Sequence, residues 1–217
     1  MKKKKRSDGE KTRASILRAA KPLFARHGRD GVGMREIAKK ANVTLPTIPY
    51  HFGAKNNLYR EAATDAIKLG IDYEKLFKDN CEIDYTNKQQ VSNALFGIIN
   101  SLGDSLCRKE FTHQTDLICQ ALFCHDLVLQ RALIDVFDLF EIPFLKFMDK
   151  AGIKYTDEDK AFWLVFIWSQ MLFYVSAREF ICVDLDMDEI PPPFYERLAW
   201  KTAHMLCLEF GLPNPVI

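Results

Sequence analysis

Patterns typical of β-structure are almost absent from this sequence of 217 residues: no stretch alternates polar and apolar residues with an enrichment in β-branched side chains. No Cys-x-x-Cys pair occurs among the six cysteines, and the Gly-x-Ser-x-Gly, P-loop, Gly-x-Gly-x-x-Gly and His-Glu-x-x-His motifs are all missing. These absences argue against the enzymes and metal sites that such motifs mark. We therefore expect no catalytic residue, no cofactor and no bound metal.

A secretory signal and a membrane span are also not expected. The basic start, Met1 to Arg6, is not followed by the apolar stretch of a signal peptide. One nearly uninterrupted apolar stretch, residues 161–177, has a length at the short limit for crossing a bilayer. A soluble helix buried on both sides explains it better, because no second apolar stretch exists and the flanks are charged. We predict a cytoplasmic protein, with no membrane partner, whose cysteines are buried thiols.

Charge divides the chain into two parts. Residues 1–60 contain 16 Lys and Arg against 4 Asp and Glu, a net charge of +12, whereas residues 61–217 contain 14 against 25, a net charge of −11. Fourteen of the 16 phenylalanines lie in the acidic part. A basic head joined to an acidic, Phe-rich body indicates two functions, one of them on a polyanion.

Helical periodicity runs through nearly the whole chain, so the expected fold class is all-α. Gly28 should end the first helix, Pro143 should kink the seventh, and Thr156 should cap the eighth. The proline run 191–193 should separate the last two helices. About nine helices are expected, near residues 10–27, 34–40, 45–51, 55–78, 88–107, 112–123, 125–150, 157–181 and 193–210.

A helix-turn-helix is the first specific motif. A short amphipathic helix ends at Ala41, and Asn42 follows as a residue that readily adopts the left-handed conformation. Val43 then points back to the core, and Thr44 is suited to cap the next helix. The second helix of such a unit enters the major groove of DNA. An ordinary pair of helices would show the same local pattern, and the +12 charge favours DNA binding.

The run ILRAAKPLFARHG…MREIAKKANVTLPTIPYHFGAKNNLY extends over about 45 residues. It resembles the DNA-binding domain of TetR-family transcriptional regulators, and its ending YHFG.K..LY is similar to that of the CecR-like subgroup. The body carries no comparable motif. The positions that match the family pattern are Ile37, Ala38, Ala41, Val43, Thr44, Thr47, Ile48, His51, Phe52, Lys55 and Leu58.

Three positions depart from the family pattern. Asn42 and Pro46 stand where the family usually has glycine, and Pro49 stands at a usual tyrosine. Pro46 falls in the first turn of the recognition helix, where proline is tolerated. Pro49 removes the amide that would bond the carbonyl of Leu45, so this helix should be tightened or bent.

Candidate DNA contacts lie on the recognition helix and on the elements beside it. Hydroxyl and ring groups of that helix can reach bases or phosphates, while Ile48 and Phe52 should pack inward. Tyr50 is either a DNA contact or a packed aromatic, and the Lys2–Arg6 tract is either an arm on the phosphates or a disordered tail. The predicted DNA-binding residues are Arg35, Thr44, Leu45, Thr47, Tyr50, His51 and Lys55.

Phenylalanines recur on one face of the seventh helix, at spacings of 3, 4 and 3 from Phe137 to Phe147. Such a stripe is more often core than pocket, but the TetR resemblance implies that the body binds a small molecule. We therefore expect a pocket for an apolar or aromatic effector. Its predicted lining is Phe96, Phe123, Phe137, Phe140, Phe144, Phe147, Phe162 and Phe166.

The helix near residues 157–181 is apolar nearly all round, so one face needs a partner. The resemblance implies that this helix and the last one form a two-fold homodimer. The predicted interface residues are Trp163, Trp168, Phe173 and Trp200.

These features predict a helix-turn-helix DNA-binding domain in residues 1–60, with a basic arm at 1–9, and a ligand-binding and dimerisation domain in residues 61–217. The resemblance implies a repressor that a small effector releases from a palindromic double-stranded DNA operator. The alternative is a metal- or redox-sensing regulator, because two histidines and three cysteines lie close together. Their spacing matches no common zinc site, so buried structural cysteines are favoured; these five are Cys107, His113, Cys119, Cys124 and His125.

Overall fold

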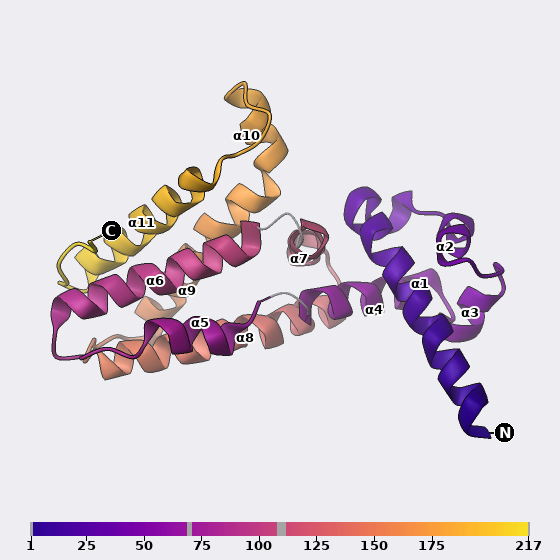
Figure 1. The fold of residues 1–217 in the computed structure, drawn as a ribbon, viewed down its shortest axis with the longest axis horizontal. Helices are drawn as coiled ribbons and strands as arrows, with labels where there is room; N and C mark the ends of the chain where they lie inside the picture. The colour runs from indigo at the N-terminus through magenta and orange to yellow at the C-terminus, as the bar shows by residue number, and fades with distance from the viewer. Residues whose placement is uncertain (1, 69–70, 108–111, 217) are drawn as a thin grey trace. The chain divides into compact units, whose positions relative to one another are not determined.

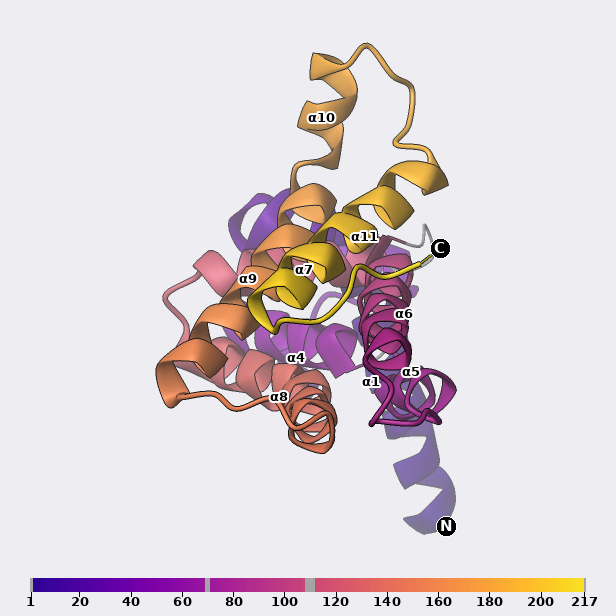
Figure 2. The same cartoon turned by 90° about the vertical axis from the view of Figure 1, so that its left-hand side faces the viewer.

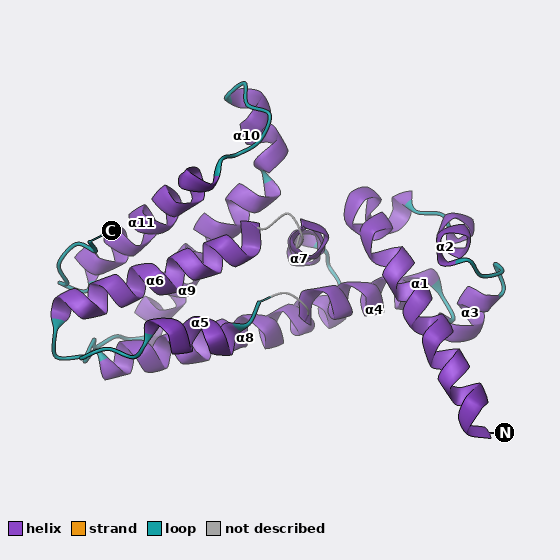
Figure 3. Ribbon diagram, viewed as in Figure 1, coloured by secondary structure: helices purple, strands orange, loops and turns teal. Residues whose placement is uncertain are grey.

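The computed structural model describes residues 2–68, 71–107 and 112–216, without the side chains of residues 2–7, 67 and 68. Every regular element in these ranges is a helix (Figure 3), which confirms the all-α class. The described ranges hold eleven helices, where about nine were expected. They are α1 (Lys2–Gly31), α2 (Met34–Ala41), α3 (Thr47–Phe52), α4 (Lys55–Lys68), α5 (Tyr73–Asn80), α6 (Lys88–Cys107), α7 (Thr112–Phe123), α8 (Leu127–Lys150), α9 (Asp157–Ser176), α10 (Arg178–Asp184) and α11 (Pro192–Glu209).

The extra helices arise where two predicted helices are each divided. The helix expected over 55–78 is α4 followed by α5, because the Asp72 carboxylate accepts the Lys75 N–H at 2.9 Å and caps a new start. The helix expected over 157–181 is α9 followed by α10, bent by 66° at the break. Periodicity did not reveal either break, because both halves keep an apolar face.

The first helix begins earlier than residue 10. Its backbone is helical from Lys2, and the side chains of the predicted Lys2–Arg6 arm lie outside the described residues. Gly28 has a φ of 66° and breaks the helical geometry there, so the expected glycine stop is confirmed. The final residues of α1 follow this kink as a short continuation.

Other local predictions have mixed outcomes. Thr156 caps α9 in a reciprocal capping box with Asp159, as expected. Pro191 precedes α11, and proline occupies its first positions. Pro143 lies inside α8, and the structure assigns one helix from Leu127 to Lys150. The predicted effect of Pro143 therefore does not divide the helix.

The chain forms two compact units. Unit 1 comprises residues Met1–Gly70 and His113–Ile134, and unit 2 comprises Ile71–Thr112 and Asp135–Ile217. The predicted domain boundary at residue 60 therefore falls inside α4, and residues 113–134 pack with the basic head rather than with the body. The α8 helix contributes residues to both units.

Unit 1 is built on the first four helices (Figure 1), where α1 packs against α2 and α4. Phe24 of α1 lies edge-on to Tyr59 of α4, with ring centroids 5.2 Å apart. Ile37 of α2 and Ile48 of α3 are fully buried, so each short helix is held by one large aliphatic anchor. This core fixes the position of α3.

Unit 2 is a layered bundle in which α6 packs against α5, α9 and α11 (Figure 2). The fully buried side chains include Leu95, Ile98, Ile99 and Leu102 of α6, together with three phenylalanines of α8. Near the C-terminal end of α6, α10 and the chain that follows it project out of the bundle (Figure 2).

No single helix in the described ranges is long and apolar enough to cross a membrane. The α9–α10 pair passes a test of length and composition when the two helices are joined, and it is bent at the break. Trp163, Leu164, Ile167 and Trp168 of α9 are buried within the chain.

Candidate DNA-binding surface and effector cleft

The turn between α2 and α3 has the geometry that the sequence predicts. Asn42 lies in the left-handed region, with φ 55° and ψ 47°. Its N–H donates to the carbonyl of Lys39, and the N–H of Val43 donates to the carbonyl of Ala38 at 3.0 Å. This pair of bonds is a Schellman motif, which ends α2 and turns the chain sharply into the next helix.

The recognition helix α3 starts with a tight turn. The Thr47 N–H donates to the carbonyl of Thr44 at 3.0 Å, and the Ile48 N–H donates to that of Leu45 at 3.3 Å. These bonds span three residues, because Pro49 has no N–H for the normal bond to Leu45. The predicted tightening is confirmed, while the predicted start at residue 45 is wrong, since α3 begins at Thr47.

Thr44 does not cap the recognition helix as expected. No side chain caps the backbone of α3, and the Thr44 hydroxyl instead lies 2.9 Å from the Thr47 hydroxyl. One hydroxyl donates to the other, so the two side chains hold each other in place. Both remain near the start of α3, where the first turn of a recognition helix meets base edges.

Tyr50 is the most exposed aromatic residue of the recognition helix. Its side chain is 83% exposed and its ring stands edge-on to that of His51, with centroids 5.1 Å apart. Ile48 and Phe52 are buried, which confirms their predicted inward packing. The two buried residues are four positions apart and share one face of α3, so Tyr50, midway between them, lies on the opposite, outward face.

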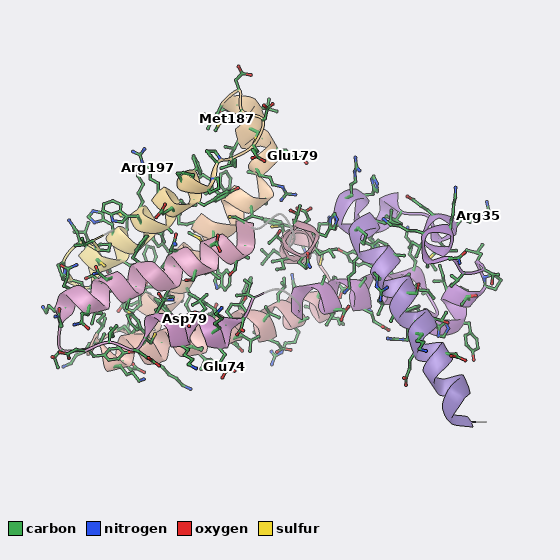
Figure 4. All side chains as sticks on the ribbon, in the orientation of Figure 1. Arg35, Glu74, Asp79, Glu179, Met187 and Arg197 are labelled. Atoms are coloured by element: carbon green, nitrogen blue, oxygen red, sulfur yellow. The ribbon has the colours of Figure 1, made fainter. Side chains whose placement is uncertain are left out.

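The two predicted phosphate contacts lie beside α3. Arg35 is exposed on α2, and Figure 4 shows it projecting outward from that helix. Lys55 begins α4 and is half-buried; its Nζ donates to the carbonyl of Asp30 at 3.4 Å. Leu45 is exposed at the turn before α3. The seven predicted DNA-binding residues thus lie on α2, on the turn before α3, on α3 and at the start of α4.

Sequence inspection missed two contacts that attach α7 and the start of α8 to the head. The Gln120 side-chain amide donates to the carbonyl of Ala25 at 2.7 Å, and Arg60 of α4 pairs with the Asp126 carboxylate at 2.7 Å. Burial acts to raise the pKa of Asp126, but the hydrogen bonds from Arg60 and from backbone N–H groups lower it below its ordinary value. No local pattern signals these contacts, because each joins residues more than 60 positions apart.

The phenylalanine stripe of α8 forms core rather than a pocket. Phe140, Phe144 and Phe147 are buried, and Phe137 stacks on Trp168 with centroids 4.2 Å apart. Phe140 also contacts the rings of Phe144 and Trp168 at 5.6 and 5.4 Å. Rings packed on one another in this way are typical of a hydrophobic core, so the core interpretation is favoured for this face over a pocket.

The other predicted pocket residues are not gathered around that stripe. Phe123 and Phe162 are exposed, while Phe96 and Phe166 are half-buried. Phe123 belongs to unit 1 and the other three to unit 2. These four rings were expected to face the stripe from other helices. Periodicity could not test that expectation, because it says nothing about the rotation of one helix against another.

A large cleft lies instead at the end of unit 2 that carries α10. Its volume is about 1380 Å³, and it is bordered by the end of α6, by α10 with the loop that follows, and by the start of α11. Glu179 and Met187, which line it, are labelled in Figure 4 on and after α10. Six carboxylates and one guanidinium line it, from Asp104, Glu179, Asp186, Asp188, Glu189, Glu196 and Arg178.

Two polar groups meet in this cleft with raised pKa values. Burial raises the pKa of the Cys107 thiol to about 12, although a hydrogen bond with Tyr195 lowers it in part. Burial also raises the pKa of Tyr195 to about 12. Cys107 therefore stays a neutral thiol at pH 7, which makes it a poor nucleophile. The acidic run after residue 183 and the prolines that follow were the only sequence signals for this cleft.

The proposed interface residues on α9 and α11 divide into two groups. Trp163 and Trp168 are buried by the chain itself, so they cannot form the contact surface predicted for them. Phe173 is exposed, and Trp200 is half-buried with its N–H donating to the carbonyl of Pro215. The exposed apolar side chains of α9 and α11 are Phe162, Val165, Phe173, Met205 and Leu208.

The cysteines give no support to a metal centre. In the described ranges, no group of three or more His, Cys, Asp and Glu side chains could hold a metal ion. Cys207 is fully buried and the other five cysteines are partly exposed, so the expectation of buried thiols holds for Cys207 alone.

Comparison with known proteins identifies the head. Residues 16–62 match the model for bacterial regulatory proteins of the TetR family. Over 81 residues the chain is 32% identical to the HTH-type transcriptional regulator AcrR of Shigella flexneri, a stretch that covers 36% of this chain and 38% of that relative. The chain thus aligns with less than half of this relative's length.

Solved structures share the fold over nearly the whole chain. A protein described as a TetR-family transcriptional regulator, from Mesorhizobium loti, has a TM-score of 0.66 and 18% identity, and the match covers 93% of this chain and 97% of that one. A transcriptional regulator from Rhodococcus has a TM-score of 0.61 and 16% identity, with 93% and 98% covered. At these identities the likeness establishes the fold.

Proposed function

We propose that the chain is a transcriptional repressor of the TetR family that a small molecule releases from its operator; the match of residues 16–62 to the family model and the 32% identity to AcrR over 81 residues support the family. Such a regulator is not an enzyme, and it works in the cytoplasm, where the DNA lies. DNA binding is assigned to residues 1–60, and ligand binding and dimerisation to residues 61–217. The ending Tyr50-His51-Phe52-Gly53 supports placement in the CecR-like subgroup.

The observation that carries this proposal is the outward face of α3. A Schellman turn, a buried anchor at Ile48 and an exposed Tyr50 present one helix face to a groove. Thr44 and Thr47 add hydroxyls at the start of the helix, and Leu45 and His51 complete the surface. Arg35 and Lys55 supply positive charge on either side for phosphates.

The partner is a double-stranded operator with palindromic half-sites, bound by a homodimer. The exposed apolar residues of α9 and α11 support a second copy of the chain as the occupant of that face. A two-fold dimer places two recognition helices on successive major grooves, about 34–36 Å apart. Phe173 and Trp200 stay in the proposed interface, while Phe162, Val165, Met205 and Leu208 take the place of the two buried tryptophans.

The cleft at the end of unit 2 is the proposed effector site. Valine, methionine, isoleucine and proline side chains give it an apolar wall, and six carboxylates line it beside one arginine. This chemistry suits a small apolar or aromatic molecule that also carries a positive charge. The effector needs no contact with DNA, because it need only bind one state of the dimer more tightly than the other.

Selection of bound sequences from a random duplex library tests the function. We expect enrichment of a palindrome whose half-sites are separated by about one helical turn, with affinity that falls steeply as salt rises. A library of aromatic and aliphatic cations is then screened for release of the selected duplex. Failure to enrich any sequence would contradict the DNA-binding proposal, and enrichment of a single half-site would contradict the dimer.

A further inference from the structure

The recognition helix α3 is too short to hold its own orientation. It has six residues, Thr47–Phe52, and an isolated helix of that length is not stable in water. Its orientation therefore depends on the residues that attach it to other helices. The buried pair Ile48 and Phe52 lies on one face of α3, and a rotation of the helix about this face would change the direction in which Tyr50 projects.

Phe52, the last residue of α3, is held by two other helices. From α4, the Asn57 side-chain amide donates to the carbonyl of Phe52 at 3.2 Å. From α1, the guanidinium of Arg13 lies over the Phe52 ring, with its central carbon 4.8 Å from the ring centre. A cation at this distance is attracted to the face of an aromatic ring. Arg13 therefore fixes the ring that anchors the end of α3.

Arg13 is itself held in place by α4. Its guanidinium donates to the carboxylate of Glu61, and the two side chains form a partly exposed ion pair. A guanidinium suits both contacts, because a planar group can stack on a ring through its face and donate hydrogen bonds from its edge. One side chain thus joins three helices: α1 carries it, α3 supplies the ring and α4 supplies the carboxylate.

A second contact places the same face of α1 against α3. A methyl group added to Gly9 would lie 4.0 Å from the Cε1 atom of His51. Gly9 and Arg13 are one helical turn apart, so they share a face of α1, and this face meets the consecutive residues His51 and Phe52. The His51 ring in turn stands edge-on to Tyr50, with centroids 5.1 Å apart. The position of α1 thus bears on the most exposed aromatic residue of α3.

We propose that Arg13 is a positioning residue for operator recognition. By holding the Phe52 ring against α1 and α4, it sets the rotation of α3 and the direction of Tyr50. Arg13 acts through Phe52 and not by contact with DNA, so it affects discrimination between sequences and leaves the electrostatic attraction to all duplexes unchanged. This inference rests on the proposed DNA-binding function and adds to it a residue of α1.

Fluorescence anisotropy of the full chain with the selected operator and with a scrambled duplex of equal length tests the proposal. Arg13→Gln should weaken operator binding about two- to fivefold, as the loss of a cation–π contact at a partly exposed site predicts. Its affinity for the scrambled duplex should match that of Arg18→Gln, a control that removes the same charge from an exposed position of α1. Arg13→Lys keeps a cation near the ring and should restore most of the preference for the operator.

The salt dependence of operator binding separates positioning from direct contact. All affinities are measured at a temperature where circular dichroism shows each variant folded, so that lost stability does not alter them. A positioning role leaves the slope of log affinity against log salt equal in Arg13→Gln and Arg18→Gln, whereas a phosphate contact would flatten it by about one unit in Arg13→Gln and overturn the proposal. An operator preference in Arg13→Gln equal to that of the parent would also overturn it. A parent chain that does not distinguish the two duplexes would instead contradict the proposed function, and the role of Arg13 would fail with it.

Discussion

Replacement of Phe140 by alanine tests whether this ring of unit 2 belongs to a packed core or borders a ligand pocket. The Phe140 side chain has no exposed surface, and its ring lies 5.6 Å from Phe77, 5.6 Å from Phe144 and 5.4 Å from Trp168. Truncation of so buried a ring removes its transfer free energy and leaves a cavity, which together cost about 3–5 kcal/mol. For a chain of this size the melting temperature should fall by roughly 6–20 °C.

Urea unfolding monitored by tryptophan fluorescence measures the loss in free energy of unfolding, because Trp168 lies against the site of the change. Phe123→Ala is the matched control: both positions were predicted to line one pocket, yet Phe123 is 83% exposed and should change stability by less than about 0.5 kcal/mol. A loss below about 1 kcal/mol for Phe140→Ala would refute the packing argument, since only a ring that borders open space is removed so cheaply.

Four further substitutions test the DNA contacts, the proposed dimer interface and one buried carboxyl group. Lys55→Ala should weaken binding to every duplex and flatten the slope of log affinity against log salt by about one unit, and an unchanged slope would remove Lys55 from the phosphate contacts. Tyr50→Ala should instead reduce the preference for the selected operator. Phe173→Glu should convert the dimer into a monomer by light scattering, and a persistent dimer would place the interface elsewhere. Burial raises the pKa of Glu141 above its ordinary value of 4.5, although the Trp168 hydrogen bond opposes the shift; folding is therefore favoured when the group is protonated and loses that contribution as pH rises. Glu141→Gln keeps an acceptor for Trp168 and should be more stable than the parent at pH 7, with the difference vanishing below pH 4.5.

Local signals in the sequence predicted the parts of the fold that local chemistry determines. Asn42 ends α2 in the left-handed conformation, Gly28 breaks α1, and Thr156 caps α9, each because one residue type suits one backbone geometry. The tight start of α3 also follows from a single residue, since Pro49 cannot donate the bond that an ordinary helix would form.

The sites in unit 2 were harder to predict, because they depend on how helices are rotated against each other. The stripe from Phe137 to Phe147 has the same periodicity whether it faces a ligand or another helix, and in the structure it faces Trp168 and the rest of the core. Trp163 and Trp168 were expected on the outer face of α9, but both turn inward. Periodicity identifies an apolar face and does not identify what covers it.

The division of the chain into two units gives α8 a role that no local motif indicates. Its first residues, up to Ile134, belong to unit 1, and the rest, from Asp135, belongs to unit 2. Asp126 stands directly before the helix, where its carboxylate accepts the N–H groups of Val128 and Leu129 and pairs with Arg60 of α4. The α4 helix packs against both α1 and α3, so this ion pair attaches the start of α8 to the helices that hold the recognition helix in unit 1.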